Sequence, residues 1–192
     1  MSNSVTRSRR VRRTLLALLP LAPFAALATD ADFAEHSHTA ASGVLLANVR
    51  AHTARYLDVN AATGDGFVRA TPCVSGPDFG AMGVHFIRLD RLNSIDQPKD
   101  SKPTALIYEP TASGGLRLVG VEFIVMAGPW DTAHPKSPPT LDGNLFNLVG
   151  APNRFGLDAF YELHAWAWQA NPTGNFADWN TRVVCDHQPA GG

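Results

Sequence analysis

The hydrophobic pattern of the chain divides it into one helical segment and a later series of short strands. In residues 44–62, side chains recur with alternating spacings of four and three, which places them on one side of a helix. The residues with this spacing are Leu45, Val49, His52, Tyr56 and Val59. Gly64 and Gly66 follow and are expected to end the helix.

Beyond Gly66 the chain consists of short apolar runs separated by Gly, Pro, Asp and Ser. Strands are predicted over 82–87, 104–109, 116–126, 161–168 and 181–185, and a helical turn over 176–179. Ser113-Gly114-Gly115 is a hairpin signal. Residues 88–103 and 128–143 are expected to be loops, and 145–149 has no clear assignment. One helix followed by four or five strands, without βαβ alternation, predicts an α+β fold with a curved antiparallel sheet. The pattern does not distinguish an open sheet from a barrel.

The segment 161–168 has the most informative alternation. In a strand, Glu162, His164, Trp166 and Trp168 share one face, and smaller or aliphatic residues fill much of the other. This face combines ionisable groups with two large rings. The rings are expected to be core side chains rather than a stacking platform for a ligand.

The N-terminal segment is typical of an export signal. Five arginines precede an apolar run from Leu15 to Ala28 that contains two prolines and ends in small residues. These are the parts of a secretory signal peptide, and the run is too short for a comfortable membrane anchor. Ser8-Arg9-Arg10-Val11 is similar to a twin-arginine signal. We therefore expect a signal peptide (1–28), a flexible lead-in (29–43) and one globular domain (44–192), located in the periplasm or secreted.

Charge excludes some classes of partner. Of the 16 basic residues, five lie in the signal segment, which leaves 11 against 17 acidic residues, a formal charge of −6. An acidic domain without a Lys/Arg stripe is a poor candidate for binding nucleic acid or anionic membranes. No later segment is apolar for long enough to span a bilayer. The sequence identifies no particular partner, and a small ligand or a metal ion remains open.

The two cysteines, Cys73 and Cys185, are expected to form a disulfide, because an even pair in an exported chain usually does so. Two metal-binding thiolates are the alternative, but no CxxC spacing supports them. The disulfide would connect the beginning of the sheet region to the C-terminus.

Three predicted strands carry an ionisable residue where an apolar one is expected: His85, Glu122 and His164. An isolated carboxylate in an apolar strand is costly unless it is paired, protonated or bound to a cation. Two histidines and one carboxylate form a set that binds Zn, Cu, Fe or Mn and leaves coordination positions open.

Other residues are candidates for a supporting role. Glu109 and Glu162 are candidate fourth ligands or hydrogen-bond partners for a histidine, and His134 is a candidate ligand from a loop. Asp142, Asp158 and Asp178 look like ordinary turn residues.

Two other interpretations of the three residues remain open. They can line a pocket without a metal, or they can satisfy one another within the core. GxSxG, P-loop and helix-opening GxGxxG motifs are absent, so the sequence defines no reaction. Convergence of the side chains on a concavity would favour a binding or catalytic site. Dispersal would favour a structural or interaction domain of the cell envelope.

Several strings of the sequence occur in one order: MGVHF, LIYEP, LVGVEFIV and YELHAWAWQANPTGNFADWN, followed by VVC. Over residues 56–185 the chain thereby resembles an uncharacterised family of small exported bacterial proteins. The resemblance implies a secreted single domain. It implies no activity and no catalytic residues.

Overall fold

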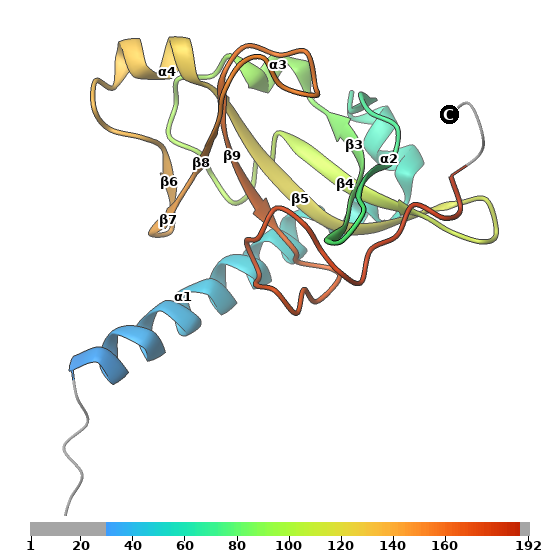
Figure 1. Ribbon diagram of the computed structural model, residues 1–192, viewed down its shortest axis with the longest axis horizontal. Coiled ribbons are helices and arrows are strands. Elements are labelled where there is room, and N and C mark those ends of the chain that lie inside the picture. The colour runs from blue at the N-terminus through green and yellow to red at the C-terminus, as the bar shows by residue number, and fades with distance from the viewer. Residues whose placement is uncertain (1–29, 189–192) are drawn as a thin grey trace, which may run out of the picture.

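An open antiparallel sheet forms the centre of the molecule, as shown by a computed structural model that describes residues 30–188, with side chains from residue 42 onward (Figure 1). The strand order is β1-β3-β4-β5-β9-β8, and β2 also pairs with β3. Within the described residues the two ends of this order do not pair, so the sheet does not close into a barrel. The α+β prediction is therefore confirmed. The strands are β1 (Val68–Arg69), β2 (Val74–Gly76), β3 (Gly80–Ile87), β4 (Ala105–Pro110), β5 (Leu116–Met126), β8 (Asn147–Val149) and β9 (Phe160–Ala165).

The boundaries of the four long strands agree with those predicted from the apolar pattern to within a few residues, and β9 differs most. It ends at Ala165, where the regular ladder breaks: Ala167 N donates back to Ala165 O at 2.8 Å in a tight turn, and Trp168 N and Gln169 N then both donate to Val119 O of β5, at 3.1 and 2.9 Å. The strand predicted over 181–185 is wrong, since this segment is a turn followed by irregular chain. Residues 176–179 are also irregular rather than a helical turn.

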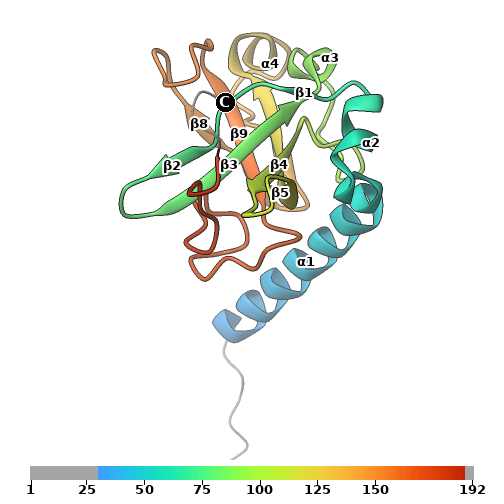
Figure 2. The same cartoon turned by 90° about the vertical axis from the view of Figure 1, so that its right-hand side faces the viewer.

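The helical region begins earlier than the pattern predicts and is interrupted. Helix α1 (Asp30–Thr53) is followed by a 3-10 turn, η1 (Ala54–Leu57), and by α2 (Val59–Gly64). Asp58 separates the last two, because its carboxylate accepts the backbone N–H of Asn60 at 2.9 Å and caps α2. Most of the expected lead-in thus belongs to α1, whose N-terminal part projects away from the sheet (Figures 1 and 2).

Two segments expected to be loops contain short helices, α3 (Leu89–Leu92) and α4 (Ala127–Ala133). Pro129 does not prevent α4, because it lies in the first turn, where the missing N–H has no helical partner to lose. A small hairpin, β6 (Thr140–Leu141) and β7 (Asn144–Leu145), follows.

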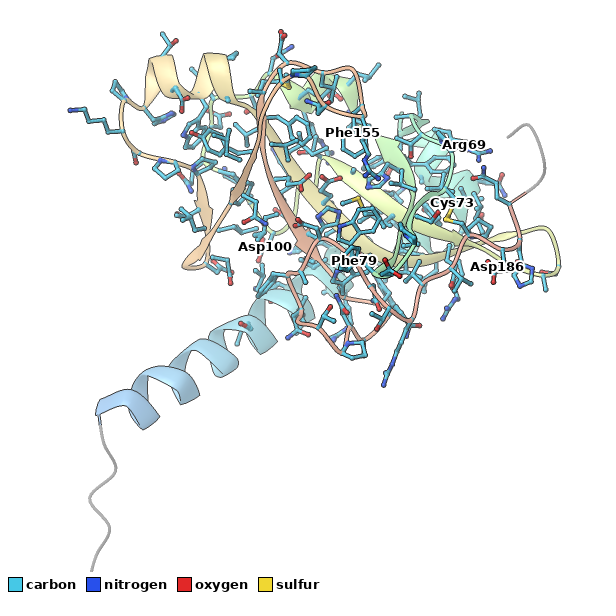
Figure 3. The ribbon with its side chains drawn as sticks, in the orientation of Figure 1. Arg69, Cys73, Phe79, Asp100, Phe155 and Asp186 are labelled. Atoms are coloured by element: carbon cyan, nitrogen blue, oxygen red, sulfur yellow. A yellow bond between two sulfur atoms is a disulfide. The ribbon has the colours of Figure 1, made fainter. Side chains whose placement is uncertain are left out.

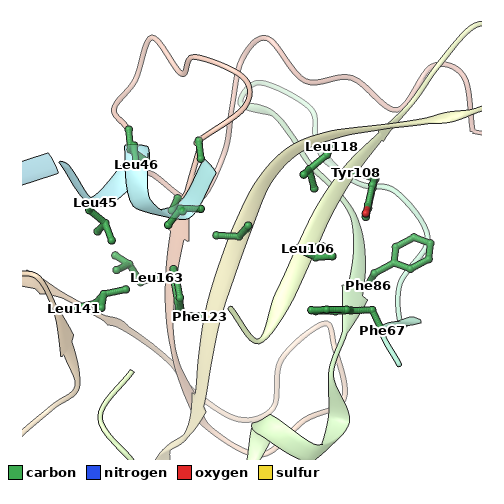
Figure 4. Close-up of a cluster of buried hydrophobic side chains, with 14 of the residues drawn as sticks. Leu45, Leu46, Phe67, Phe86, Leu106, Tyr108, Leu118, Phe123, Leu141 and Leu163 are labelled. Carbon is green, nitrogen blue, oxygen red and sulfur yellow. The ribbon is translucent and has the colours of Figure 1, made fainter. Parts of the chain in front are cut away.

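The main core lies between α1 and one face of the sheet (Figure 4). Leu45, Leu46 and Val49 of α1 are buried in the same cluster as Phe123 and Leu163 of the sheet. Burial of each such side chain contributes about 1.5–3 kcal/mol. This packing holds one face of β5 and β9 rigid and turns their alternate residues toward the opposite face.

The predicted disulfide is present and joins the segment before β2 to the C-terminal segment. The Cα atoms of Cys73 and Cys185 are 5.6 Å apart, and Figure 3 shows Cys73 beside that segment. Along residues 30–188, no helix combines the length and apolar character needed to cross a bilayer. The signal peptide predicted over 1–28 lies outside the described residues.

Candidate functional site

The face of the sheet opposite α1 carries the three residues singled out by the sequence. Glu122 of β5 and His164 of β9 are direct partners in the strand register, so their side chains leave the sheet on the same side. His85 reaches Glu122 across β4, where Ala105 is the register partner of Glu122. The small side chain of Ala105 leaves room above the intervening strand.

The three side chains converge. His85 Nε2 lies 3.4 Å from Glu122 Oε2, and one ligand atom from each of His85, Glu122 and His164 lies within 4.8 Å of the others. The residues retain exposed fractions of only 3%, 3% and 1%, so bulk solvent has little access to them. Residues from three strands therefore form one buried group with the donor atoms of a metal site.

His85 is held in place from outside the group. Its Nδ1 lies 3.2 Å from Thr71 Oγ1, and the same hydroxyl oxygen accepts the backbone N–H of His85 at 3.0 Å. In the tautomer that carries its proton on Nδ1, the ring donates to Thr71, and the Nε2 lone pair faces Glu122. Histidines that bind metals usually donate the N–H of the far ring nitrogen to an oxygen acceptor, and Thr71 supplies such an oxygen here.

His164 lacks such support. Both ring nitrogens are buried and have no hydrogen-bond partner among the described residues. The nearest carboxylate oxygen on its Nδ1 side, Asp178 Oδ1, is 3.9 Å away, beyond hydrogen-bond range. The ring stacks on Trp166 at 5.9 Å and meets His85 edge-on at 6.2 Å. A buried polar group without a partner costs about 1–3 kcal/mol, so the His164 ring still needs a hydrogen-bond partner or a bound ion.

A second group of candidate ligands shares His164. Glu162, which precedes it on the same face of β9, and Asp178 each place a carboxylate oxygen within 4.8 Å of a His164 nitrogen and of one another. Asn147 Nδ2 donates to Asp178 Oδ1 at 3.0 Å and fixes this loop residue. The sequence indicated Glu162 but treated Asp178 as an ordinary turn residue, because no local pattern links the turn after β9 to the sheet.

Burial favours the neutral form of each core group. Desolvation lowers the pKa of His164 to about 3, and desolvation together with the charge of His164 lowers the pKa of His85 to about 3. Desolvation, followed by the charge of Glu162, raises the pKa of Glu122 well above its usual value. Burial also raises the pKa of Glu162 to about 7. At neutral pH both imidazoles are therefore uncharged, and they offer lone pairs rather than protons.

Glu109, His134 and Trp168 do not join this cluster. Glu109 pairs with Arg117 and accepts the backbone N–H of Val184 at 2.9 Å. The His134 ring stacks on Trp130 at 4.0 Å, in a part of the chain that packs on the α1 side. Trp168, predicted to share the His164 face, packs on the α1 side and donates to Thr53 Oγ1 at 3.0 Å, because β9 ends before it.

A pocket of about 150 Å³ reaches His85 and Glu122 from one side. Its walls are mainly apolar and come from β3, β5, α3 and the loop between β8 and β9, where Phe155 lies (Figure 3). Two of the three converging residues, His85 and Glu122, therefore lie at the edge of a concavity, as expected of a binding or catalytic site, whereas His164 lies beside them and does not line it.

Comparisons with known proteins do not assign this site. No protein-family model, curated protein or solved structure matches the chain. The resemblance to a family of exported bacterial proteins remains a prediction, and the function has to be argued from the geometry above.

Proposed function

We propose that the protein binds one divalent transition metal ion through His85, Glu122 and His164. The observation that carries this proposal is His164, a fully buried ring with two unpartnered nitrogens inside a cluster of ligand atoms. Buried polar atoms in native proteins nearly always have a partner. A metal ion would provide such a partner. Its positive charge would also offset the charge of the buried carboxylates, which burial otherwise makes costly.

The donor set and its spacing support this proposal. Two ligand atoms that each lie about 2.0–2.2 Å from one tetrahedral ion are about 3.4 Å apart, and His85 Nε2 and Glu122 Oε2 are separated by 3.4 Å. Two imidazoles and one carboxylate suit Zn, Fe, Mn or Cu and leave positions for other ligands. Glu162 and Asp178 are placed to fill such a position or to bind a neighbouring ion.

The electrostatics also favour a cation. Glu122 and Glu162 lie close together within the buried cluster, and two carboxylates there cannot both ionise cheaply. A divalent ion reverses this cost, because it stabilises the deprotonated carboxylates that bind it.

A structural or interaction domain of the cell envelope is the alternative. Such a domain needs no pocket at its buried polar residues, whereas His85 and Glu122 line one here. The disulfide and the lack of a membrane-spanning helix within residues 30–188 fit an exported protein. We place the protein outside the cytoplasm, with cleavage after Ala28. Intact-mass analysis of exported material tests this location, and a mature chain that retains Arg7–Arg13 would contradict it.

The metal proposal is tested by thermal melts of chelator-treated protein, with and without Zn, Cu, Mn or Fe. A ligand that binds only the folded state at 100 times its Kd adds about 2.7 kcal/mol of stability. Wild type should therefore melt at a higher temperature with the matching metal. His164→Ala and the size-conserving Glu122→Gln should lose this shift.

His134→Ala is the matched control, since it removes a histidine that lies outside the cluster. Its own melting temperature will change with the lost stacking, but its metal-induced shift should equal that of wild type. The same shift in the His164 variant as in wild type, or no shift in either, would refute the proposal and leave a metal-free polar site or a structural domain.

A further inference from the structure

The pocket beside the cluster has two chemically different ends. Its apolar wall consists of Ile87, Leu92, Ile124, Phe155, Leu157 and Phe160. At the other end, Thr71, His85 and Glu122 contribute polar atoms. Leu89 of α3 also lines the pocket and is 60% exposed, so the pocket meets the solvent beside α3.

The size of the pocket limits what can enter it. Its volume is about 150 Å³, and an apolar protein cavity of about this volume accommodates benzene. Phe155 meets His85 edge-on at 6.3 Å and Phe160 at 6.0 Å, so part of the wall is aromatic. Such a wall favours a ring or a compact branched chain as the body of the ligand.

We infer that the pocket takes a small uncharged molecule, with one ring or a branched chain of about six carbons, whose single oxygen faces the ion held by His85 and Glu122. This inference rests on the proposed metal site and adds the class of its ligand. The apolar body contacts Leu92, Phe155 and Leu157, and the oxygen occupies an open coordination position.

The absence of charge in the ligand follows from the walls of the pocket. An ionised group placed against Leu92, Phe155 and Leu157 would lose its hydration without gaining a partner. The polar end contains no Lys or Arg, and with Glu122 and Glu162 both ionised the charge of the divalent ion is already balanced, so nothing there selects an anion.

Cobalt-loaded protein provides the test, because the visible spectrum of Co²⁺ responds to its ligands. Phenol is the probe, and toluene is a control of similar size without an oxygen. Phenol should change the spectrum of wild type with saturation. Toluene should leave the spectrum unchanged but should weaken the response to phenol by competition.

Substitutions at two positions locate the effect. Leu92→Trp fills the pocket from α3, and Leu92→Phe is a milder version of the same change. Both variants should bind Co²⁺ as wild type does. Leu92→Trp should weaken the phenol response at least tenfold. Leu145→Trp changes a leucine that is 60% exposed and outside the pocket, and it should respond normally. Normal Co²⁺ binding without a phenol response, or an equal response in wild type and Leu92→Trp, overturns the inference alone. Failure of wild type to bind Co²⁺ overturns the proposed function and this inference together.

Discussion

The backbone holds His164 and Glu122 in fixed positions, yet the partners around their buried side chains do not fully satisfy them. The backbone ladder fixes both residues, because they are register partners on β9 and β5. Their side chains, in contrast, depend on each other and on Glu162, since solvent is excluded. The sequence alone indicated these two residues because each interrupts an apolar run. Asp178 could not be recognised in this way, since acidic residues in turns are common.

The metal-free protein should have a stability plateau between about pH 4.5 and 6.5. Folded His85 and His164 have pKa values of about 3 against an ordinary 6.5, so their contribution to stability is lost as the pH falls below 6.5. Folded Glu122 and Glu162 have raised pKa values against an ordinary 4.5, so their contribution is lost as the pH rises above 4.5. Between about pH 4.5 and 6.5, the stability gained from the histidines as the pH rises opposes the stability lost from the glutamates.

Glu122→Gln separates these contributions in denaturant unfolding with chelator present. Glutamine resembles the protonated acid, so the variant should gain stability relative to wild type as the pH rises from 5.5 to 8.5. The expected change is on the order of 1 kcal/mol per pH unit. A variant whose stability relative to wild type does not change over the same range would show that Glu122 is ionised in the folded, metal-free protein.

At the scale of elements, β3 depends on glycines that allow other segments to approach closely. Gly80 has φ +80°, and a Cβ at this position would lie 2.1 Å from Asn180 O. Asn180 forms a bridge with Ala81, so this approach holds the segment that carries Asp178 against the sheet. The apolar runs predicted the long strands well because both faces of the sheet are buried. They could not reveal β1 and β2, which are short and partly exposed.

Gly80→Ala should therefore destabilise the protein more than Gly114→Ala. Both glycines have φ +80°, but nothing lies within 4 Å of a Cβ at Gly114. The Gly114 change should cost about 1–2 kcal/mol, the usual penalty for a left-handed backbone with a Cβ. The Gly80 change adds a backbone clash and should cost clearly more in denaturant unfolding. Equal costs would mean that the contact between β3 and the Asn180 segment is not required.

At the scale of the whole molecule, the disulfide is a covalent link between two segments that lie far apart in the sequence. Cys73 and Cys185 are separated by 112 positions in the sequence, and both lie near elements that hold the site. Cys73 follows Thr71, the partner of His85, by two residues. The pairing could be predicted because only two cysteines exist. The open shape of the sheet could not, because closure depends on pairing between strands far apart in sequence.

Replacement of both cysteines by serine should lower the free energy of unfolding by up to about 4–5 kcal/mol, because a loop of this length gains much entropy in the unfolded chain. Guanidinium unfolding of the oxidised wild type and of the double variant measures this difference. A loss below about 1 kcal/mol would show that the unfolded chain is already constrained there.

The central claim is that His85, Glu122 and His164 hold a metal ion, and anomalous diffraction from crystals of metal-loaded protein tests it most directly. Data collected on either side of the absorption edge of the bound metal should give one strong peak. That peak should lie about 2.0–2.2 Å from a nitrogen of His85, a nitrogen of His164 and an oxygen of Glu122. A peak at His134 or at the protein surface, or a cluster without a peak at full metal loading, would contradict the account.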